Sequence, residues 1–258
     1  MTVTASGGSS AANSIRQVAV VIPAHNEEQH LKRALTAARD AADQAESNLT
    51  GVRVQVVVVL DSCTDGSAAV AAVFAAEDPR YMVLPVDFRS VGKSRQAGAE
   101  AALENATRRS PAGGSTAGSS LRHVWLANTD ADSCVPENWL VRQLELAAGG
   151  ADVVLGSVEP DGHGMPHHLA ARWHARHVPT ENHPHVYGAN LGVRASSYLA
   201  AGGFPGVDFD EDRALVDRLR SSGASMVATD TTRVLTSGRT VGRAPRGFAA
   251  YLLALAQP

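Results

Sequence analysis

Short runs of β-branched residues alternate with alanine-rich stretches along residues 17–155 of the chain. Several runs are almost continuously apolar, as in RVQVVVVL, which is typical of strands buried on both faces of a sheet. The alanine-rich stretches place their apolar residues at helical spacing. This pattern predicts strands over residues 17–22, 53–60, 81–86, 121–127 and 151–155, and helices over residues 27–47, 65–76, 93–107 and 136–148.

Alternation of strands and helices predicts an α/β fold with a mostly parallel sheet that helices cover on both faces. In such sheets ligands bind beyond the carboxyl ends of the strands. Three of the predicted strands lead into polar loops, namely PAHNEE (23–28), DSCTD (61–65) and NTDADS (128–133). We therefore expect these three loops to meet at one edge of the sheet.

The pattern changes after residue 156. The segment 156–186 is rich in His, Pro and Gly, with seven histidines between His163 and His185. Their spacings match no standard zinc motif, although one of them could still reach a metal ion. The rest of the chain predicts a helix around 168–177, a strand at 187–194, a turn at 202–205, an amphipathic helix at 210–221, a last strand at 225–229, a Gly/Arg-rich loop at 237–247 and a short apolar helix.

Length and composition limit the class of protein. A chain of 258 residues can bury one substantial core, and its formal charge of -3 argues against a general nucleic-acid binder. The two cysteines, Cys63 and Cys134, are too few for a disulfide framework and suit a reducing compartment. No run approaches the ~20 apolar residues of a membrane span, and the N-terminus resembles no secretory signal. We expect a cytoplasmic protein without stable membrane insertion, and a disordered tail over residues 1–16.

Five motifs occur in order along the chain: PAHNEE, LDSCTDGS, GKSRQAG, TDADS, and GGFP followed by FDEDRAL. Together they resemble family-2 glycosyltransferases of the GT-A fold, over roughly residues 17–245. The resemblance implies one Rossmann-like domain at 17–258. Its nucleotide-sugar-binding half is expected at 17–155, its acceptor half at 156–245 and a C-terminal helix at 246–258.

The carboxylates of NTDADS lie two residues apart, and in extended backbone they would point to the same side and repel each other. Hard divalent cations take carboxylate and phosphate oxygens as ligands, so a cation is one explanation. A turn or helix cap is the other. The resemblance implies that Asp132 binds Mg²⁺ or Mn²⁺ and that Asp130 contributes to the metal and leans toward the ribose.

The other loops at the same edge carry candidate nucleotide contacts. Asp61 follows an apolar strand and could accept hydrogen bonds from a base or ribose, although the family usually has a second Asp where this chain has Ser62. The helix that begins near Gly92 offers free N–H groups to an anion, and a solvated helix start is the alternative. By resemblance, the nucleotide-sugar contacts are Pro23, Ala24, His25, Glu27, Asp61, Lys93, Arg95, Asp130 and Ala131.

Direct displacement at a sugar carbon needs a carboxylate that removes the proton of the attacking hydroxyl. Three acids crowd the start of the helix at FDEDRAL, which the helix dipole alone would also favour. The resemblance points to Asp212 as the base, with Glu211 as the second choice. It also places Gly188 and Asn190 near the sugar and the acceptor, and Arg239 and Arg243 in a loop that closes over the diphosphate; a turn and a solvated basic loop are the alternatives.

The sequence therefore predicts a metal-dependent, inverting transfer of a sugar from a nucleotide-diphosphate sugar to a small or lipid-linked hydroxyl acceptor. A retaining transferase of the glucosyl- or mannosyl-glycerate type and a catalytically silent nucleotide-sugar-binding protein are the alternatives. A dehydrogenase is disfavoured because no Gly-x-Gly-x-x-Gly follows the first strand. A Gln-x-x-Arg-Trp motif is also absent, which argues against polymer synthesis. A homodimer is compatible with the sequence.

Overall fold

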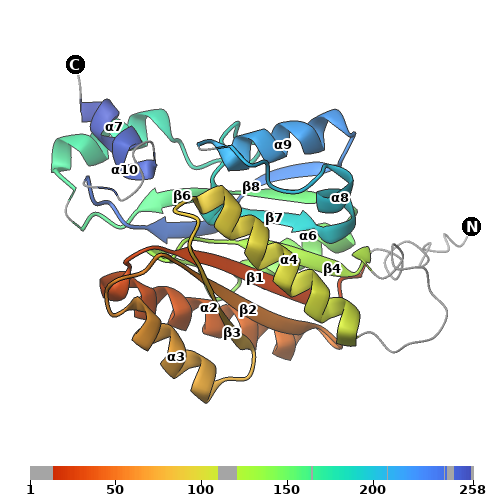
Figure 1. The fold of residues 1–258 in the computed structure, drawn as a ribbon. Helices are drawn as coiled ribbons and strands as arrows, with labels where there is room; N and C mark the ends of the chain where they lie inside the picture. The colour runs from red at the N-terminus through yellow and green to blue at the C-terminus, as the bar shows by residue number, and fades with distance from the viewer. Residues whose placement is uncertain are drawn as a thin grey trace, which may run out of the picture.

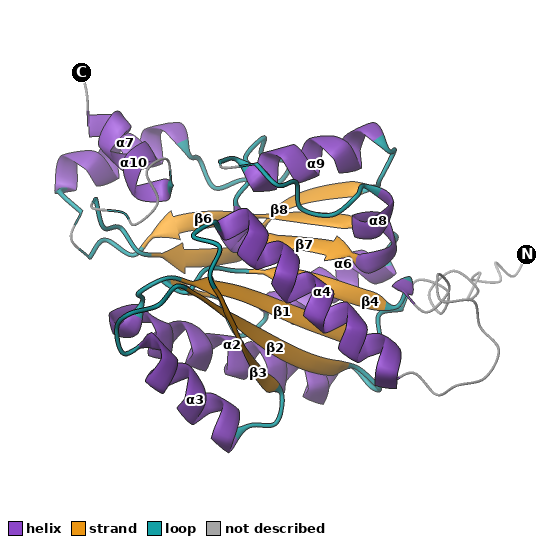
Figure 2. Ribbon diagram, in the orientation of Figure 1, coloured by secondary structure: helices purple, strands orange, loops and turns teal. Residues whose placement is uncertain are grey.

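Eight strands form one sheet with the order β3-β2-β1-β4-β7-β6-β8-β5, and helices cover both of its faces (Figures 1 and 2). The computed structural model describes residues 14–109, 121–163, 165–207, 209–240, 242 and 247–256. The strands are β1 (Gln17–Ala24), β2 (Arg53–Asp61), β3 (Tyr81–Val86), β4 (Val124–Asn128), β5 (Ser133–Cys134), β6 (Val153–Pro160), β7 (Leu191–Arg194) and β8 (Met226–Thr236).

Strands β1 to β4 run parallel, in the order expected of a Rossmann-like half. Strand β7 is antiparallel to both of its neighbours, β4 and β6, whereas β6 and β8 are parallel. The mostly parallel α/β sheet predicted from the sequence is therefore confirmed. Its parallel half brings the carboxyl ends of β1, β2 and β4 to one edge.

The core has two layers, one on each face of the sheet, because alternate residues of each strand point to opposite faces. In β1, Val20 and Ile22 pack with α2, α3 and α6, whereas Val21 packs with α4, α8 and α9. The helices are α2 (Glu28–Asn48), α3 (Ser67–Glu77), α4 (Val91–Arg109), α6 (Trp139–Ala148), α7 (His167–Arg176), the 3₁₀ helix η1 (Gly188–Asn190), α8 (Ala195–Ala200), α9 (Glu211–Ser221) and α10 (Phe248–Ala256). None of these described helices is long and apolar enough to cross a membrane.

Several boundaries differ from the sequence prediction in the second half. The strands expected at 151–155 and 225–229 continue to Pro160 and Thr236, because residues 158–160 pair with residues 234–236 in a parallel ladder whose first pair, Val158 and Val234, is buried in the core. The strand expected at 187–194 begins with η1, and α8 was not predicted.

The predicted tail also ends earlier than expected. Residues 1–13 lie outside the described range, but Ile15 is buried in the core and the main-chain N–H of Arg16 donates to the carbonyl of His123 at 2.9 Å. Residues 14–16 therefore belong to the folded domain.

Helix α4 approaches the sheet closely at Gly98. A Cβ atom at this position would lie 2.6 Å from Val21 Cγ1 and 2.8 Å from Val59 Cγ2. We expect Gly98→Ala to lower the free energy of unfolding by about 1–2 kcal/mol in urea denaturation, because overpacking outweighs the gain in helix propensity. Gly206→Ala is the control, since no atom lies within 4 Å of its added Cβ. Equal unfolding midpoints for the two variants would contradict this packing.

Candidate active site

A cavity of about 800 Å³ lies at the carboxyl ends of β1, β2 and β4, between their loops and the start of α9. The three polar loops predicted to meet at one edge all contribute to it. The residues that line it are Pro23, Ala24, His25, Asn26, Glu27, Asp61, Ser62, Thr64, Arg89, Ser90, Val91, Ser94, Asp130, Ala131, Asp132, Phe209, Asp210, Glu211, Arg239 and Gly247.

Hydrogen bonds join the first two of these loops. The His25 ring donates from Nδ1 to the carbonyl of Asp61 at 2.6 Å, and the N–H of Glu27 donates to Ser67 Oγ at 2.8 Å. The side chain of Asn26 accepts from the N–H of Thr64 at 2.7 Å. The ends of β1 and β2 are thereby held in one arrangement before any ligand arrives.

Backbone strain concentrates at the same cavity. Five non-glycine residues of the described chain have positive φ, and four of them line the cavity: Asn26 (56°), Ser62 (51°), Arg89 (50°) and Asp210 (56°). Left-handed backbone costs a non-glycine residue free energy and persists where surrounding contacts hold it, which is common at functional sites.

The guanidinium of Arg239 joins two acids from different loops. It donates to both oxygens of Glu27, at 2.8 and 2.6 Å, and lies 3.0 Å from Asp132 Oδ2. Burial is the main cause that raises the pKa of Asp132, to about 7, and repulsion from Asp130 is the next. The positive charge of Arg239 opposes this shift but does not cancel it. The protein therefore compensates the negative charge at Asp132 incompletely.

A second cation, Arg95, lies at the centre of an acidic cluster. Its side chain is 3% exposed and contacts Asp130 at 2.5 Å and Glu211 at 3.3 Å. It also donates to the carbonyl of Gly188 at 2.8 Å. Although burial by itself would lower the pKa of Arg95, the charges of Asp130, Glu211 and Asp212 raise it. The guanidinium thus remains charged; its Nε lies 3.3 Å from Glu211 Oε1 but makes no hydrogen bond within the described chain.

The two candidate bases differ in their surroundings. Burial raises the pKa of both carboxyls, and Arg95 opposes the shift in each case. Glu211 lines the cavity and pairs with Arg95, whereas Asp212 lies next to Gly188 and accepts the N–H of Arg213 at 2.7 Å. A raised pKa suits a carboxylate that accepts a proton near neutral pH.

Asp61 lines the cavity, but its oxygens are already used by the protein. Oδ1 accepts the N–H groups of Phe88 and Arg89, each at 2.8 Å, and Oδ2 accepts Ser90 N–H at 2.9 Å and Ser94 Oγ at 2.8 Å. Burial alone would raise the pKa of Asp61, yet these donors lower it below its usual value. The carboxylate shapes the loop between β3 and α4.

The structure separates some of the predicted site residues from the cavity. Lys93 is exposed and does not line it, and Asn190 is fully buried in the core. The Asn190 amide donates to the carbonyls of Ser157 and Thr232, at 2.8 and 2.7 Å, and accepts Trp139 Nε1–H at 2.8 Å, so its hydrogen-bonding groups are used within the fold. Arg243 lies outside the described residues.

Other lining residues were not predicted from the sequence. Asn26, Ser62 and Asp210 flank predicted site residues, so their proximity was the available signal. Phe209 opens the motif FDEDRAL, which was its signal, whereas Arg89 had none, because its position depends on the strained turn before α4.

Comparison with known sequences decides the family. The sequence profile of glycosyl transferase family 2 matches residues 19–198, most of the chain. This chain is a family-2 glycosyltransferase. No curated protein matches the glycosyltransferase in a sequence search.

Solved structures confirm the GT-A fold of the glycosyltransferase. S. aureus TarS 1-349 is similar with a TM-score of 0.58 and 15% identity, over 86% of this chain and 60% of TarS. The mannosyltransferase PcManGT from Pyrobaculum calidifontis, in complex with GDP-Man and Mn²⁺, has a TM-score of 0.59 and 18% identity, over 95% of this chain and 70% of its own. GalNAc-T7 with UDP, GalNAc and Mn²⁺ has a TM-score of 0.60 and 14% identity, over 87% and 44% of the two chains. The glycosyltransferase thus spans less than two thirds of the TarS fragment.

The residues at the cavity fit a divalent cation. Six carboxylates and two guanidinium groups line the described cavity, so an anionic diphosphate needs additional positive charge there. Within the described part of the chain no group of three or more His, Cys, Asp or Glu side chains could hold a metal ion. Asp130 and Asp132 would therefore supply a pair of ligands, and phosphate oxygens and water the rest, as Mg²⁺ commonly requires.

The hydrogen bonds of Asp61 predict a pH-dependent contribution to stability. We expect Asp61→Asn to lower the free energy of unfolding at pH 7 by about 2–4 kcal/mol, because the new amide turns N–H groups toward N–H donors. The folded pKa of Asp61 lies below its usual value, so the carboxylate's contribution is present above the usual pKa and lost as pH falls through the folded pKa. The gap between wild type and variant in urea denaturation should therefore shrink in acid.

The exposed Asp40 of α2 provides the control for this prediction. Asp40→Asn should change the free energy of unfolding by less than about 0.5 kcal/mol. Equal stability of the two variants at pH 7 would show that the bonds to Asp61 contribute nothing.

Proposed function

We propose that the chain transfers a sugar from a nucleotide-diphosphate sugar to a small or lipid-linked hydroxyl acceptor, with inversion at the sugar carbon and with Mg²⁺ or Mn²⁺ bound. The observation that carries this proposal is the excess of carboxylates over guanidinium groups in a cavity at the strand ends. Sheets of this kind bind nucleotides at that edge, and an anion enters an acidic cavity together with a cation.

The donor would lie along the β1, β2 and β4 loops. We assign Pro23, Ala24 and His25 to the nucleotide, and Asp132 with Asp130 to the cation, which when bound neutralises charge that develops on the leaving diphosphate. Arg239 lies 3.0 Å from Asp132, close enough to reach a diphosphate at the same place. We do not assign Arg95 or Lys93 to the phosphates. Arg95 is buried and paired with acids, and Lys93 does not line the cavity.

Asp212 is proposed as the base. An acceptor oxygen forms the new bond to the anomeric carbon, the bond from that carbon to the phosphate oxygen breaks, and the proton of the acceptor hydroxyl passes to the carboxylate. We choose Asp212 because it matches the family motif in FDEDRAL; it accepts the N–H of Arg213 at 2.7 Å and does not line the described cavity, whereas Glu211 is held by Arg95 at 3.3 Å. Glu211 remains the second candidate because it lines the cavity.

Donor identity can be measured directly. We expect one of UDP-, GDP- or dTDP-sugars to raise the melting temperature, and Mn²⁺ to increase that shift, because a ligand of the native state stabilises it by mass action. No shift from any donor, with or without metal, would contradict the proposal. The anomeric configuration of the product, read by NMR, distinguishes inversion from retention.

The cation ligand is tested by Asp132→Asn. We expect the metal-dependent part of the donor-induced melting shift to be lost and donor affinity to fall about 10–100-fold, since the neutral amide is a poor ligand for a hard cation. Asp40→Asn, on the exposed face of α2, should retain the full shift. Unchanged metal dependence in the Asp132 variant would exclude this carboxylate as a ligand.

The base is tested by Asp212→Asn. Transfer should fall about 10²- to 10⁴-fold while donor affinity changes little, because proton removal matters for the reaction and not for nucleotide binding. Asp217→Asn, at an exposed position of the same helix, is the control, and Glu211→Gln tests the second candidate. A greater loss of transfer in the Glu211 variant, with donor affinity retained, would reassign the base.

A further inference from the structure

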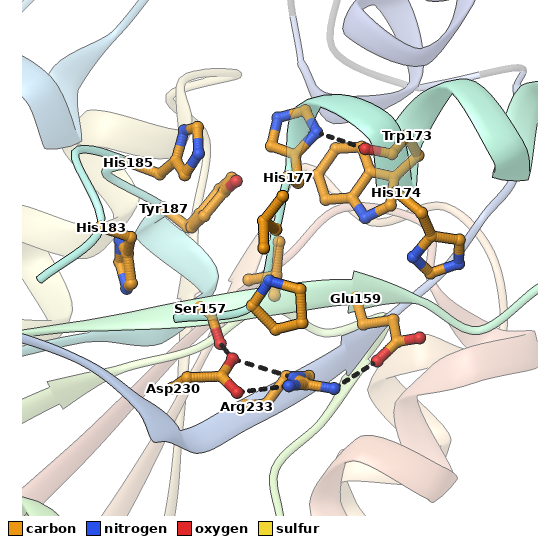
Figure 3. Close-up of a pocket in the computed structure, with 13 residues that line it drawn as sticks. Ser157, Glu159, Trp173, His174, His177, His183, His185, Tyr187, Asp230 and Arg233 are labelled. Atoms are coloured by element: carbon orange, nitrogen blue, oxygen red, sulfur yellow. Dashed lines mark hydrogen bonds and ion pairs between the residues drawn. The ribbon is translucent and has the colours of Figure 1, made fainter. Parts of the chain in front are cut away.

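A second, smaller cavity lies away from the strand ends that line the donor site. It is about 40 Å³ in volume and lies between α7, the chain that follows it, and strands β6 and β8 (Figure 3). Histidines dominate its upper wall, with His174 and His177 on α7 and His183 and His185 on the following segment. We call this cavity the histidine pocket.

Within the described residues, the imidazole of His183 has no hydrogen-bond partner. Its residue is 5% exposed, and neither Nδ1 nor Nε2 contacts a donor or acceptor of the described chain. The neighbouring ring of His177, by contrast, bonds through Nδ1 to the carbonyl of Trp173 at 3.1 Å and through Nε2 to the Tyr251 hydroxyl at 3.0 Å. A buried polar group without a partner costs free energy, so the two nitrogens of His183 indicate a ligand that bonds to both.

The charges around the histidine pocket disfavour an anion. Arg233 is already engaged by Asp230, at 3.0 Å from its Nε, and by Glu159, also at 3.0 Å. Burial lowers the pKa of His177 and His185, which disfavours the charged form of both rings. Two carboxylates therefore face one guanidinium, and the pocket has no spare positive charge for a phosphate or carboxylate.

Hydrogen-bond chemistry then selects the ligand. A neutral imidazole presents one N–H donor and one acceptor nitrogen. A hydroxyl group both donates and accepts, so a pair of hydroxyls satisfies both nitrogens. A carboxylate lacks a donor and an ammonium lacks an acceptor, so neither can bond to both nitrogens of a neutral imidazole.

Size and wall composition agree with a polyol. A void needs about 10–15 Å³ to hold one water, so a cavity of about 40 Å³ has room for a few heavy atoms, such as a diol or one edge of a sugar ring. Aromatic rings continue from His183 through His185 to Tyr187, with centroids 5.9 and 5.8 Å apart, and provide apolar walls for C–H groups. Val178, 63% exposed, lines the mouth, so a ligand can enter from solvent.

The histidine pocket is joined to the proposed base through a short segment of chain. Tyr187 lines the pocket, and the next residue, Gly188, lies so close to α9 that an added Cβ would be 3.4 Å from Asp212 Oδ2. Glu211, the residue before Asp212, lines the donor cavity. The start of α9 thus lies between the donor cavity and the segment that carries the histidines.

We propose that the histidine pocket binds a neutral, polyhydroxylated group, a polyol or sugar, of the acceptor, with His183 bonded to two of its hydroxyls. This assignment rests on the proposed transfer to a hydroxyl acceptor. It predicts that the part of the acceptor bound in the histidine pocket is an uncharged polyol or glycoside.

Glycerol is the probe, and glycerate is its anionic counterpart. In two-bond ¹H–¹⁵N spectra of the ¹⁵N-labelled full chain, glycerol should shift the His183 ring resonances saturably, whereas glycerate at equal concentration should not. His183→Phe should weaken glycerol binding by about tenfold or more, because it removes both hydrogen-bonding atoms and keeps a ring of similar size. His168→Phe makes the same change at an exposed histidine of α7 outside the pocket and should bind glycerol as wild type does.

Several results would overturn the assignment. Absence of a saturable shift in wild type would mean that water satisfies His183, and stronger binding of glycerate would mean that the ligand is an anion. Glycerol binding that survives His183→Phe would place the site elsewhere. If that variant does not fold, glycerol binding to His183→Gln and to wild type tests the same assignment. The donor-induced melting shift is measured in parallel for wild type and His183→Phe. Absence of this shift in wild type would contradict the proposed function. A variant that keeps the shift but loses glycerol binding would show that the defect is confined to the histidine pocket.

Discussion

The guanidinium of Arg95 is the interaction on which the arrangement of the site depends. It is buried, and it contacts Asp130 after β4, Glu211 at the start of α9 and the carbonyl of Gly188 in η1. These groups come from segments far apart in the sequence, and the carboxylates would repel one another without a cation between them. A buried charge is tolerated where it is paired and hydrogen-bonded, so Arg95 and its acids fix one another. Arg95 therefore links Asp130, which follows β4, to Glu211 at the start of α9 through buried ion pairs.

Around this contact, the loops at the strand ends are held in conformations that are unfavourable in themselves. Positive φ at Asn26, Ser62, Arg89 and Asp210 and the incomplete compensation of Asp132 both cost stability. The carboxylate of Asp61, which accepts three N–H groups, and the bridge from Arg239 to Glu27 offset part of that cost. The cavity is thus shaped before a donor binds, which reduces the ordering that binding must supply.

The histidine-rich segment has a different character. In the cavity at the strand ends, carboxylates outnumber guanidinium groups, whereas His183 has no hydrogen-bond partner within the described chain and the one guanidinium beside it is paired with two carboxylates. These properties favour different ligands, a charged one at the strand ends and an uncharged one beside α7.

The sequence by itself determined the parallel half of the sheet and which loops meet at its edge. Continuous apolar runs such as residues 53–60 identify buried strands, and their polar ends must then lie together because parallel strands share one carboxyl edge. The place of Glu27, Asp130 and Asp132 at the cavity followed from this rule. Tertiary structure alone decided what each side chain does there. The carboxylate of Asp61 accepts hydrogen bonds from the loop between β3 and α4, and the amide of Asn190 donates hydrogen bonds to main-chain carbonyls in the core. Arg95 is enclosed by acids and His183 is left without a partner. Residue type and spacing specify which groups a chain can offer, but whether a group is already bonded depends on neighbours that only the folded chain brings into contact.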